Sequence, residues 1–352
     1  MGTTTRSHGR IQLNSAVSVI MPVLNEEAHL ATSVAEVLAQ DYPGELEIIL
    51  AVGPSRDRTA EIAAELAAGD PRIQVIDNPT GVTPDGLNLA IAASHHPVVV
   101  RVDAHGELGP DYLTTAVRLL HETDAANVGG RMDARGRTGF EQAVALAYNS
   151  RWGLGGGGFH LADTPQGPAD SVFLGCFRRD SLLSAGGYDP DLLRAQDWEL
   201  NHRLRLAGEK VIYTPLLTVT YRPRGSVRAL ARQFFKTGQW RREVIRKHPE
   251  TASLRYLAPP LMVAGVSAGV GLGASAAVTG TRAGRVGWLA PLVYALALAA
   301  GTAQLAPRAS AAARPWLPVV LATMHASWGL GFLKGLRPDQ VRRPDAAPRP
   351  TR

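Results

Sequence analysis

Short runs of consecutive apolar residues alternate with longer amphipathic segments along the first two thirds of the chain. Short β-branched runs bounded by Gly or Pro are typical of strands buried on both faces of a sheet. The predicted strands are 17–24, 45–52, 73–76, 97–102, 126–132, 172–177 and 211–221. The predicted helices between them are 25–39, 60–68, 83–94, 110–122, 139–152, 179–185 and 193–205. Strands and helices that alternate at this spacing indicate βαβ units and a parallel sheet.

Three local features refine this picture. No G-x-G-x-x-G motif follows the first predicted strand, which argues against a nicotinamide-binding Rossmann enzyme. The segment 153–160 contains five glycines, and we expect it to form no regular element because glycine loses much backbone entropy in helices and strands. It is either a flexible substrate loop or a linker. Asn25 is expected to be the N-cap of the first helix.

After residue 255 the polar pattern disappears. The segments 256–281, 286–307 and 315–333 are long and apolar, which makes them candidate transmembrane helices. Buried helices of a soluble bundle are the alternative. The preceding segment, 226–248, carries Arg and Lys on one side with Phe and Trp on the other, a pattern typical of a helix that lies at a membrane surface. An ordinary surface helix that covers the core is the alternative.

The formal net charge is +6, and the basic residues gather at 222–247, 282–285 and 334–352. Because these clusters adjoin apolar segments, they favour anionic lipid over nucleic acid as a partner. The single Cys176 excludes an intramolecular disulfide. Residues 1–16 contain no apolar stretch of the kind found in a signal peptide. The flanking charges do not settle the topology. A cytoplasmic location of residues 1–255 agrees with the basic residues 241–247 and with Arg308 and Arg314, but three crossings would then put the basic tail outside, against the positive-inside rule. Either one of the three segments is re-entrant or interfacial, or the rule is broken here.

Candidate chemistry follows the predicted strand 97–102. Ligands of open α/β sheets bind beyond the carboxyl ends of the strands, where Asp103 and His105 emerge. A carboxylate and an imidazole at this spacing suit a shared divalent ion, although a turn carboxylate and a solvated histidine are the alternative. Asp197 lies near the start of the predicted helix 193–205. It is either a functional carboxylate or an ordinary N-cap.

Seven segments occur in the order seen in one enzyme family: VSVIMPVLNEE, SRDRTAEI, GLNLAIAAS, VVVRVDAHGEL, VFLGCFRRDSLLSAGGYD, AQDWELNHRLRLAG and RALARQFFKTGQW. Together they cover roughly residues 17–242. The chain therefore resembles the inverting glycosyltransferases of family 2, and in particular the membrane-bound glucosyltransferases of succinoglycan biosynthesis. This resemblance implies a GT-A fold: an α/β architecture with a Rossmann-like mixed sheet flanked by helices, here followed by C-terminal hydrophobic helices.

The resemblance also implies roles for individual residues. Asp103 and His105 stand at the family's D-x-D position and would hold Mn²⁺ or Mg²⁺, with the histidine nitrogen favouring Mn²⁺. Asp197 matches the general base that deprotonates the acceptor hydroxyl. The expected binding residues for the sugar-nucleotide substrate, most simply a UDP-sugar, are Pro22, Val23, Asn25, Glu26, Ser55, Asp57, Asn88, Arg101 and Asp103. Those expected to bind the acceptor are Gln196, Trp198, Gln239, Trp240 and Arg241.

Three positions depart from the family pattern. Gly53 stands where the family commonly has the aspartate that reads the uracil ring, so uridine selectivity is in question. Gln196 replaces the glutamate that precedes the catalytic aspartate, and a charge that would raise the pKa of the base is therefore missing. The Q-x-x-R-W motif appears as residues 236–240 with a changed pattern, in which Trp240 is expected to stack on the acceptor sugar.

The expected organisation is a disordered tail (1–16), a GT-A domain (17–225), an amphipathic interfacial region (226–255), about three membrane helices (256–336) and a basic disordered tail (337–352). The expected function is metal-dependent transfer of a hexose, glucose in the first instance, to a lipid-linked polyprenyl acceptor in cell-envelope or exopolysaccharide biosynthesis. The protein would be a multi-pass membrane protein with a cytoplasmic catalytic domain. Two alternatives stay open: transfer to polyprenyl monophosphate, and a non-catalytic scaffold that binds the sugar nucleotide. The sequence does not indicate an oligomeric state.

Overall fold

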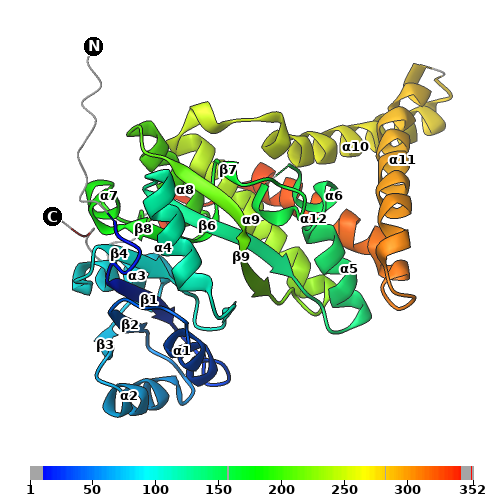
Figure 1. Cartoon of the computed structure of the whole chain (residues 1–352). Coiled ribbons are helices and arrows are strands. Elements are labelled where there is room, and N and C mark those ends of the chain that lie inside the picture. Colours follow the sequence, from blue (N-terminus) through cyan, green and yellow to red (C-terminus); the bar gives the residue numbers. More distant parts are fainter. Residues whose placement is uncertain (1–10, 157, 282, 342–349, 351–352) are drawn as a thin grey trace. The chain divides into compact units, whose positions relative to one another are not determined.

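The computed structural model describes residues 11–341 and residue 350, apart from residues 157 and 282. These residues form two compact units (Figure 1). The sheet unit contains residues 11–132, 162–221 and 339–341 together with Pro350, and the helical unit contains residues 133–161 and 222–338. Most of the two tails expected to be disordered, namely residues 1–10, 342–349 and 351–352, lies outside the described residues.

Residues 11–16 differ from the disordered tail that the sequence suggests. Ile11 is buried, and the His121 ring donates from Nδ1 to its carbonyl at 2.6 Å. The hydroxyl of Tyr42 donates to the carbonyl of Ser15. These contacts attach the segment to the sheet unit, because a buried apolar side chain and two satisfied carbonyls offset the entropy of ordering six residues.

A mixed sheet forms the centre of the sheet unit. Its strand order is β3-β2-β1-β4-β8-β6-β9-β5 in the described part of the chain, with β7 paired to β9. The strands are β1 Val17–Val23, β2 Leu46–Val52, β3 Ile73–Asp77, β4 Val98–Arg101, β5 Glu107–Leu108, β6 Asn127–Ala134, β7 Gly167–Pro168, β8 Phe173–Arg178 and β9 Val211–Tyr221. The first four run parallel, whereas β4 pairs antiparallel with β8. The predicted mixed sheet is confirmed.

The parallel half aligns the carboxyl ends of its strands. In the register, Ile20 of β1 is opposite Arg101 of β4, and Val23 of β1 is opposite Val52 of β2. The residues that follow β1, β2 and β4 therefore emerge along one edge of the sheet. All four residues of β4 are buried, as expected for a strand with neighbours on both sides and helices over its faces.

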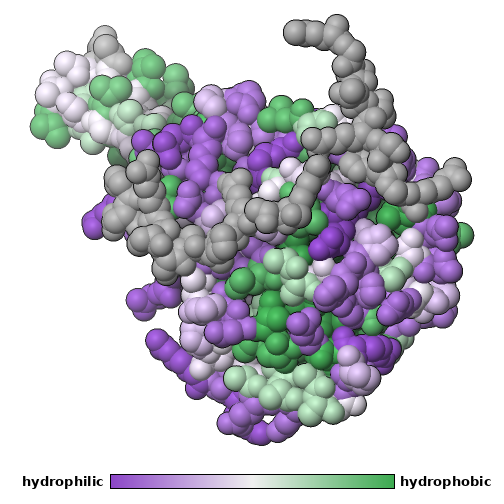
Figure 2. Space-filling view, turned by 90° about the vertical axis from the view of Figure 1, so that its left-hand side faces the viewer, coloured by the Kyte–Doolittle hydropathy of each residue, from purple (hydrophilic) through white to green (hydrophobic). Residues whose placement is uncertain are grey.

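Helices cover the sheet because each carries an apolar stripe. In α1 (Leu30–Leu38) the residues Leu30, Val34 and Val37 are buried at the i, i+4, i+7 spacing of one helix face. The helices α3 (Thr83–Ala93) and α4 (Tyr112–Thr123) pack on β1 and β8 respectively. The remaining helices of the sheet unit are α2 Thr59–Gly69, α7 Arg179–Ser184 and α8 Gln196–Leu206. On the face shown in Figure 2, hydrophilic side chains are mixed with hydrophobic ones.

The first helix begins later than its sequence predicts. Residues 24–26 form an irregular loop and residues 27–29 a turn, so α1 starts at Leu30 rather than at Asn25. Asn25 adopts φ of 56°, in the left-handed region, and its side chain accepts from the backbone N–H of Arg56 at 2.8 Å. The expectation that Asn25 caps this helix is therefore wrong, because its side chain bonds to the loop after β2 instead.

The helical unit consists almost entirely of helices. They are α5 Gly139–Tyr148, α6 Arg151–Leu154, η1 Gly158–His160, α9 Val227–Lys247, η2 Pro249–Thr251, α10 Leu254–Thr279, η3 Ala283–Trp288, α11 Leu289–Leu305, η4 Ala306–Arg308, η5 Arg314–Trp316 and α12 Leu317–Lys334. A short helix α13 spans Pro338–Val341, and its residues 339–341 belong to the sheet unit. The glycine-rich segment 153–160 is more regular than expected, since Gly153 belongs to α6 and Gly158 to η1. Gly157 lies outside the described residues.

The amphipathic helix predicted at 226–248 is present as α9, and α12 packs along it. Leu230, Phe234 and Val244 of α9 are buried. The two backbones approach closely: a Cβ atom added to Gly238 of α9 would lie 2.1 Å from the carbonyl oxygen of Trp328 in α12. Contact with a membrane surface stays a prediction for this helix.

The three apolar segments form helices long enough to cross a membrane: Leu254–Thr279, Gly284–Arg308 and Arg314–Lys334, with 26, 25 and 21 residues. Many of their large apolar side chains are exposed, among them Val278 and Val293. Apolar surface of this extent on consecutive helices is expected where lipid, rather than water, surrounds the protein. These helices are candidate membrane spans.

Candidate functional site at the carboxyl edge of the sheet

Arg101 is the centre of the site. It is the last residue of β4 and is buried, and its Nε and Nη2 atoms donate to Oδ1 of Asp103 at 3.1 and 2.9 Å. Its Nη1 atom donates to Oδ1 of Asp197. One guanidinium group thus joins two carboxylates that are 94 residues apart in the sequence. The fork of donors on arginine allows this because its N–H groups point in several fixed directions.

The start of α8 brings Asp197 to Arg101. Ala195 has φ of 60°, which turns the chain immediately before the helix, and Asp197 follows in the first helical turn. A carboxylate is favoured there by the helix dipole. The side chain does not cap the helix, because no cap hydrogen bond forms at its N-terminus. The N-cap interpretation is therefore not supported, and a functional role for this carboxylate stays a prediction.

Burial and charge act on Asp197 in opposite directions. Burial raises the pKa of this carboxyl, Arg101 opposes the rise, and the nearby charge of Asp103 adds to it. The resulting pKa lies above the usual range for aspartate. About one third of the side chain, 34%, is still exposed to solvent. A partly accessible carboxylate with a raised pKa has the properties of a general base.

Asp103 and His105 emerge from the turn after β4, which is closed by a hydrogen bond from the N–H of Gly106 to the carbonyl of Asp103. Arg101 engages Oδ1 of Asp103, and Oδ2 has no hydrogen-bond partner among the described residues. The Nδ1 atom of His105 pairs with Oε1 of Glu26 at 2.8 Å. Histidines that bind metal through Nε2 are commonly oriented by a carboxylate on Nδ1.

These residues fit a divalent ion. Asp103 offers a hard oxygen ligand and His105 a nitrogen ligand, a donor set that Mn²⁺ accepts more readily than Mg²⁺ does. Glu26, expected from the sequence to contact the sugar nucleotide, lies instead at His105 in this structure. The pair links the loop after β1 to the turn after β4.

The loops after β1 and β2 hold each other in place. The N–H of Asn25 donates to Oγ of Ser55 at 3.0 Å, and the N–H of Glu26 donates to Oγ1 of Thr59 at 2.8 Å. Asp57 accepts from Thr59, and this side-chain hydrogen bond lowers the pKa of Asp57. Pro22 and Val23 end β1 directly before this loop. The structure thus gathers the predicted residues of both loops at one edge of the sheet.

Asn88 is placed differently from the other residues expected to bind the sugar nucleotide. It is buried on α3, where its Nδ2 donates to the carbonyl of Tyr188 at 2.9 Å and its Oδ1 accepts from the N–H of Tyr188 at 2.8 Å. The ring of Tyr188 lies 5.9 Å from the guanidinium carbon of Arg101. In this structure Asn88 positions Tyr188, and contact with the substrate stays a prediction.

The sequence profile of "Glycosyl transferase family 2" matches residues 18–182. Over 323 residues the chain is 31% identical to the succinoglycan biosynthesis protein ExoA of Rhizobium meliloti strain 1021. This alignment covers 90% of this chain and 94% of ExoA. The chain belongs to glycosyl transferase family 2. The predicted family is confirmed, and this chain is a glycosyltransferase.

Two further proteins resemble this glycosyltransferase. A dolichyl N-acetyl-α-D-glucosaminyl phosphate 3-β-D-2,3-diacetamido-2,3-dideoxy-β-D-glucuronosyltransferase of Methanococcus voltae is 24% identical over 247 residues, covering 66% of this chain and 74% of that protein. Among solved structures, the mannosyltransferase PcManGT of Pyrobaculum calidifontis, in complex with GDP-Man and Mn²⁺, superposes with a TM-score of 0.61. It is 21% identical, and the superposition covers 94% of this chain and 91% of that one. The predicted GT-A fold is confirmed.

Close packing explains why residue 53 of this glycosyltransferase is glycine, at a position where the family commonly has aspartate. A Cβ atom at this position would lie 2.8 Å from Cα of Gly81 and 3.0 Å from Cδ1 of Leu24. Gly81 has φ of 65°, so its own backbone is held in a turn. The loop after β2 is therefore packed too closely for any side chain at residue 53, and an aspartate could enter only if the neighbouring backbone moved.

The residues expected to bind the acceptor lie in both units. In the sheet unit, Gln196 is buried at the start of α8, and the ring of Trp198 stacks on His202 with centroids 5.2 Å apart. In the helical unit, Nε2 of Gln239 donates to the carbonyl of Gly335 at 2.7 Å, and Trp240 is buried. Contact of these residues with an acceptor stays a prediction.

Arg241 completes the acceptor set and has an unusual environment. It is buried, and its guanidinium carbon lies 3.6 Å from the centroid of the Tyr256 ring. Burial lowers the pKa of Arg241 to about 10. The electrostatic interaction with Tyr256 opposes this change, and the positive charge of Arg255 adds to it.

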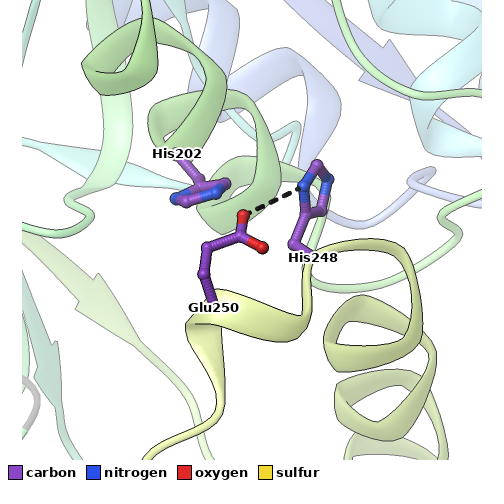
Figure 3. Close-up of side chains that lie close together, drawn as sticks. All are labelled: His202, His248 and Glu250. Carbon is purple, nitrogen blue, oxygen red and sulfur yellow. Dashed lines mark ion pairs between the residues drawn. The ribbon is translucent and has the colours of Figure 1, made fainter.

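Beyond the end of α9, His248 and Glu250 form an ion pair of 3.6 Å (Figure 3).

One residue of the site was not found from the sequence. Tyr188 is fully buried beneath Arg101, and burial raises the pKa of its hydroxyl. The only local signal is the preceding pair Gly186 and Gly187, both with positive φ, which forms the turn before it. A glycine pair predicts a turn but does not say which side chain beyond it will reach a site.

Proposed function

We propose that this family 2 glycosyltransferase is a metal-dependent inverting enzyme that transfers a hexose, glucose in the first instance, from a nucleoside-diphosphate sugar to a lipid-linked acceptor. A UDP-sugar is the proposed substrate, and cell-envelope or exopolysaccharide biosynthesis is the proposed process. The observation that carries the proposal is Arg101 bridging Asp103 and Asp197. This arginine bonds to both Asp103, which is suited to metal binding, and Asp197, which is suited to general base catalysis. The relative from succinoglycan biosynthesis supports the substrate class.

Asp103 and His105 would hold the divalent ion, which would neutralise negative charge on the departing diphosphate. Asp197 would accept the proton of the acceptor hydroxyl at its carboxylate while that oxygen attacks the anomeric carbon from the side opposite the diphosphate, which inverts the configuration there. Arg101 keeps Asp197 ionised and oriented. Glu26 orients the His105 ring through Nδ1.

The proposed domain organisation is a catalytic domain at 17–225, an interfacial region at 226–255 and membrane helices within 256–336. The catalytic domain is proposed to lie in the cytoplasm and the protein to be multi-pass. Basic residues near the apolar helices support this orientation, since Arg246 and Lys247 precede the first candidate span, Arg308 ends the second and Arg314 begins the third. Positive charges of this kind are retained on the cytoplasmic side.

Replacing the proposed base tests the mechanism. Asp197→Asn should leave the fold and sugar-nucleotide binding intact and should lower the turnover by about 10²- to 10⁴-fold, the usual contribution of a general base. The measurement is nucleoside-diphosphate release by detergent-purified protein supplied with Mn²⁺, a panel of UDP- and GDP-sugars and a lipid extract. Asp180→Asn, at an exposed position of α7, is the matched control.

Unchanged turnover in Asp197→Asn would overturn the assignment of the base. Release that persists in the presence of a chelator would overturn the metal requirement. Binding of a sugar nucleotide with no release across the whole panel would instead favour the scaffold alternative.

A further inference from the structure

The helical unit contains a cavity of about 260 Å³ that none of the predicted site residues lines. Its walls come from α6 and from the candidate membrane spans, and they include Arg151, Trp152, Arg255 and Trp328. The volume lies just below the range of small-molecule sites, roughly 300–1,000 Å³, and therefore suits a head group and the start of its chain rather than a whole lipid.

The polar groups of this cavity are hydrogen-bond donors. The Nε atom of Arg255 and the Nε1 atom of Trp328 are both buried, and neither has a hydrogen-bond partner among the described residues. Each carries an N–H and no lone pair for accepting a hydrogen bond. Two buried donors without partners are costly unless a ligand supplies acceptors. A ligand with several acceptor oxygens satisfies both.

The cavity is also positively charged. No ion pair forms at Arg151 or Arg255 within the described part of the chain, so no carboxylate neutralises them. Arg255 lies 4.9 Å from the centroid of the Tyr256 ring, and Arg241 lies 3.6 Å from the same centroid, which concentrates cations at this point. The pKa of His160 is lowered to about 3. Burial is the larger cause, and repulsion from the positive charge of Arg255 is the smaller one. Positive charge at Arg151 and Arg255 without a carboxylate partner in the described part of the chain, together with the N–H donors, favours an anion.

The remaining walls are apolar and belong to the candidate spans. Pro259 and Met262 of α10 and Ala297 of α11 line the cavity. His325 of α12 fixes the aromatic wall, because its Nε2 pairs with the carbonyl of Trp152 at 2.6 Å. Arg255 and Tyr256 are in the first turn of α10, the position in a membrane helix at which phosphate groups of lipids are found.

We propose that this cavity binds the phosphate group and the adjoining chain of a polyprenyl-phosphate-linked acceptor, with Arg255 and Trp328 as the phosphate donors. The inference rests on the proposed function for the identity of the acceptor lipid. A single apolar chain ending in phosphate matches both halves of the cavity: oxygen acceptors for the two unpartnered N–H groups, and isoprene units for the walls formed by α10 and α11.

The test measures binding and needs no turnover. Full-length protein in detergent is immobilised, and retention of radiolabelled undecaprenyl phosphate is titrated. We expect saturable retention, at least about tenfold weaker retention of neutral undecaprenol, and little displacement by inorganic phosphate or phosphatidylglycerol. Arg255→Gln should weaken retention at least about tenfold, the range for a hydrogen bond to a charged group. Arg285→Gln, which removes an exposed arginine beyond the other end of α10, should leave it unchanged.

A second variant protects the test against misfolding. Trp328→Phe removes the indole N–H, keeps an aromatic ring in the wall, and should weaken retention several-fold. Wild-type retention in both Arg255→Gln and Trp328→Phe would overturn the proposal. Equal retention of undecaprenol would show that the phosphate is not recognised. Equal displacement by phosphatidylglycerol would assign the cavity to membrane phospholipid, and equal displacement by inorganic phosphate would assign it to a free anion; either result overturns the proposal.

The two proposals fail separately. If Asp197→Asn retains full turnover while Arg255→Gln loses lipid retention, the catalytic assignment is wrong and the cavity assignment stands. If turnover depends on Asp197 while Arg255→Gln retains lipid normally, the catalytic assignment stands and the cavity assignment is wrong.

Discussion

Arg101 is a buried cation whose position depends on two carboxylates. Burial lowers the pKa of its guanidinium, but Asp103 and Asp197 more than compensate, and the pKa is raised overall. Breaking such a buried pair by removing one partner typically costs about 3–5 kcal/mol, because a charge is left without compensation. Arg101 retains Asp103 when Asp197 is neutralised, which is why Asp197→Asn is expected to fold.

The pH dependence of turnover should report the raised pKa of Asp197. A base must be deprotonated, so turnover should fall as the pH falls through this pKa, at a pH above the value of about 3.9 for an unperturbed aspartate. Arg101 lowers this pKa, so Arg101→Gln should move the acid limb to higher pH. The measurement is a pH–rate profile at saturating Mn²⁺, with thermal unfolding of the variant as the control for folding. An acid limb that stays in place or moves to lower pH would contradict the assignment.

At the scale of elements, α9 and α12 are held together by glycines that let their backbones meet. A Cβ atom at Gly331 of α12 would lie 1.9 Å from the carbonyl oxygen of Phe235 in α9, and Gly238 makes the reciprocal approach to Trp328. Small residues at contacts between membrane helices allow this kind of close packing. The motif that includes Lys236 and Trp240 therefore lies on a helix whose position depends on its partner's glycines.

Adding one methyl group to this contact should separate the helices. Gly331→Ala should lower the stability of the detergent-purified protein by about 1–3 kcal/mol, the usual cost of overpacking. Gly265→Ala in α10 is the matched control, because nothing lies within 4 Å of a Cβ atom at that position. Thermal unfolding of both variants provides the comparison. Equal unfolding temperatures for the two variants would show that the contact between α9 and α12 tolerates the extra volume.

At the scale of the whole molecule, two compact units combine catalytic chemistry with apolar helices. The sheet unit contains Arg101, Asp103 and Asp197, and the helical unit contains the three candidate spans. Exposed side chains such as Val278, Leu272 and Val293 would each face water in a soluble protein. Burying a side chain of this size is worth about 1.5–3 kcal/mol, so a lipid environment is strongly favoured.

Membrane fractionation should separate hydrophobic insertion from surface binding. We expect the protein to remain with the membrane fraction in 1 M salt and at alkaline pH and to be released by detergent, because apolar contacts with lipid are insensitive to ionic strength. A protein held only by its basic clusters would be released by salt, since the screening length falls to about 3 Å at 1 M. Release by salt alone would contradict membrane insertion of these helices.

Much of the fold and part of the site follow from local sequence. Strands such as β1 and β4 are predicted because short, mainly apolar runs rich in β-branched residues are typical of strands buried on both faces of a sheet. The three apolar helices were predicted from length and composition alone. Asp103 and His105 follow the end of β4 as predicted, because residues directly after a parallel strand lie at its carboxyl end. Their role in metal binding stays a prediction.

Other features depended on contacts between distant segments. The late start of α1 follows from hydrogen bonds between Asn25 and the loop after β2, and the order of residues 11–16 follows from contacts of Ile11 and Ser15. No local propensity encodes either contact. The glycines of residues 153–160 were expected to prevent regular structure, but tertiary packing overrides this preference in α6 and η1.

The sequence by itself determined which residues form strands and helices, where the apolar spans lie and which carboxylates are available for chemistry, because these properties depend on side chains within a few positions of one another. Only the tertiary structure decided that Arg101 joins Asp103 to Asp197, that Tyr188 lies beneath this group, and that Arg255 and Trp328 line one cavity. The physical reason is that these groups are brought together by sheet order and helix packing, and their charges and hydrogen bonds have consequences only at the short distances that the fold creates.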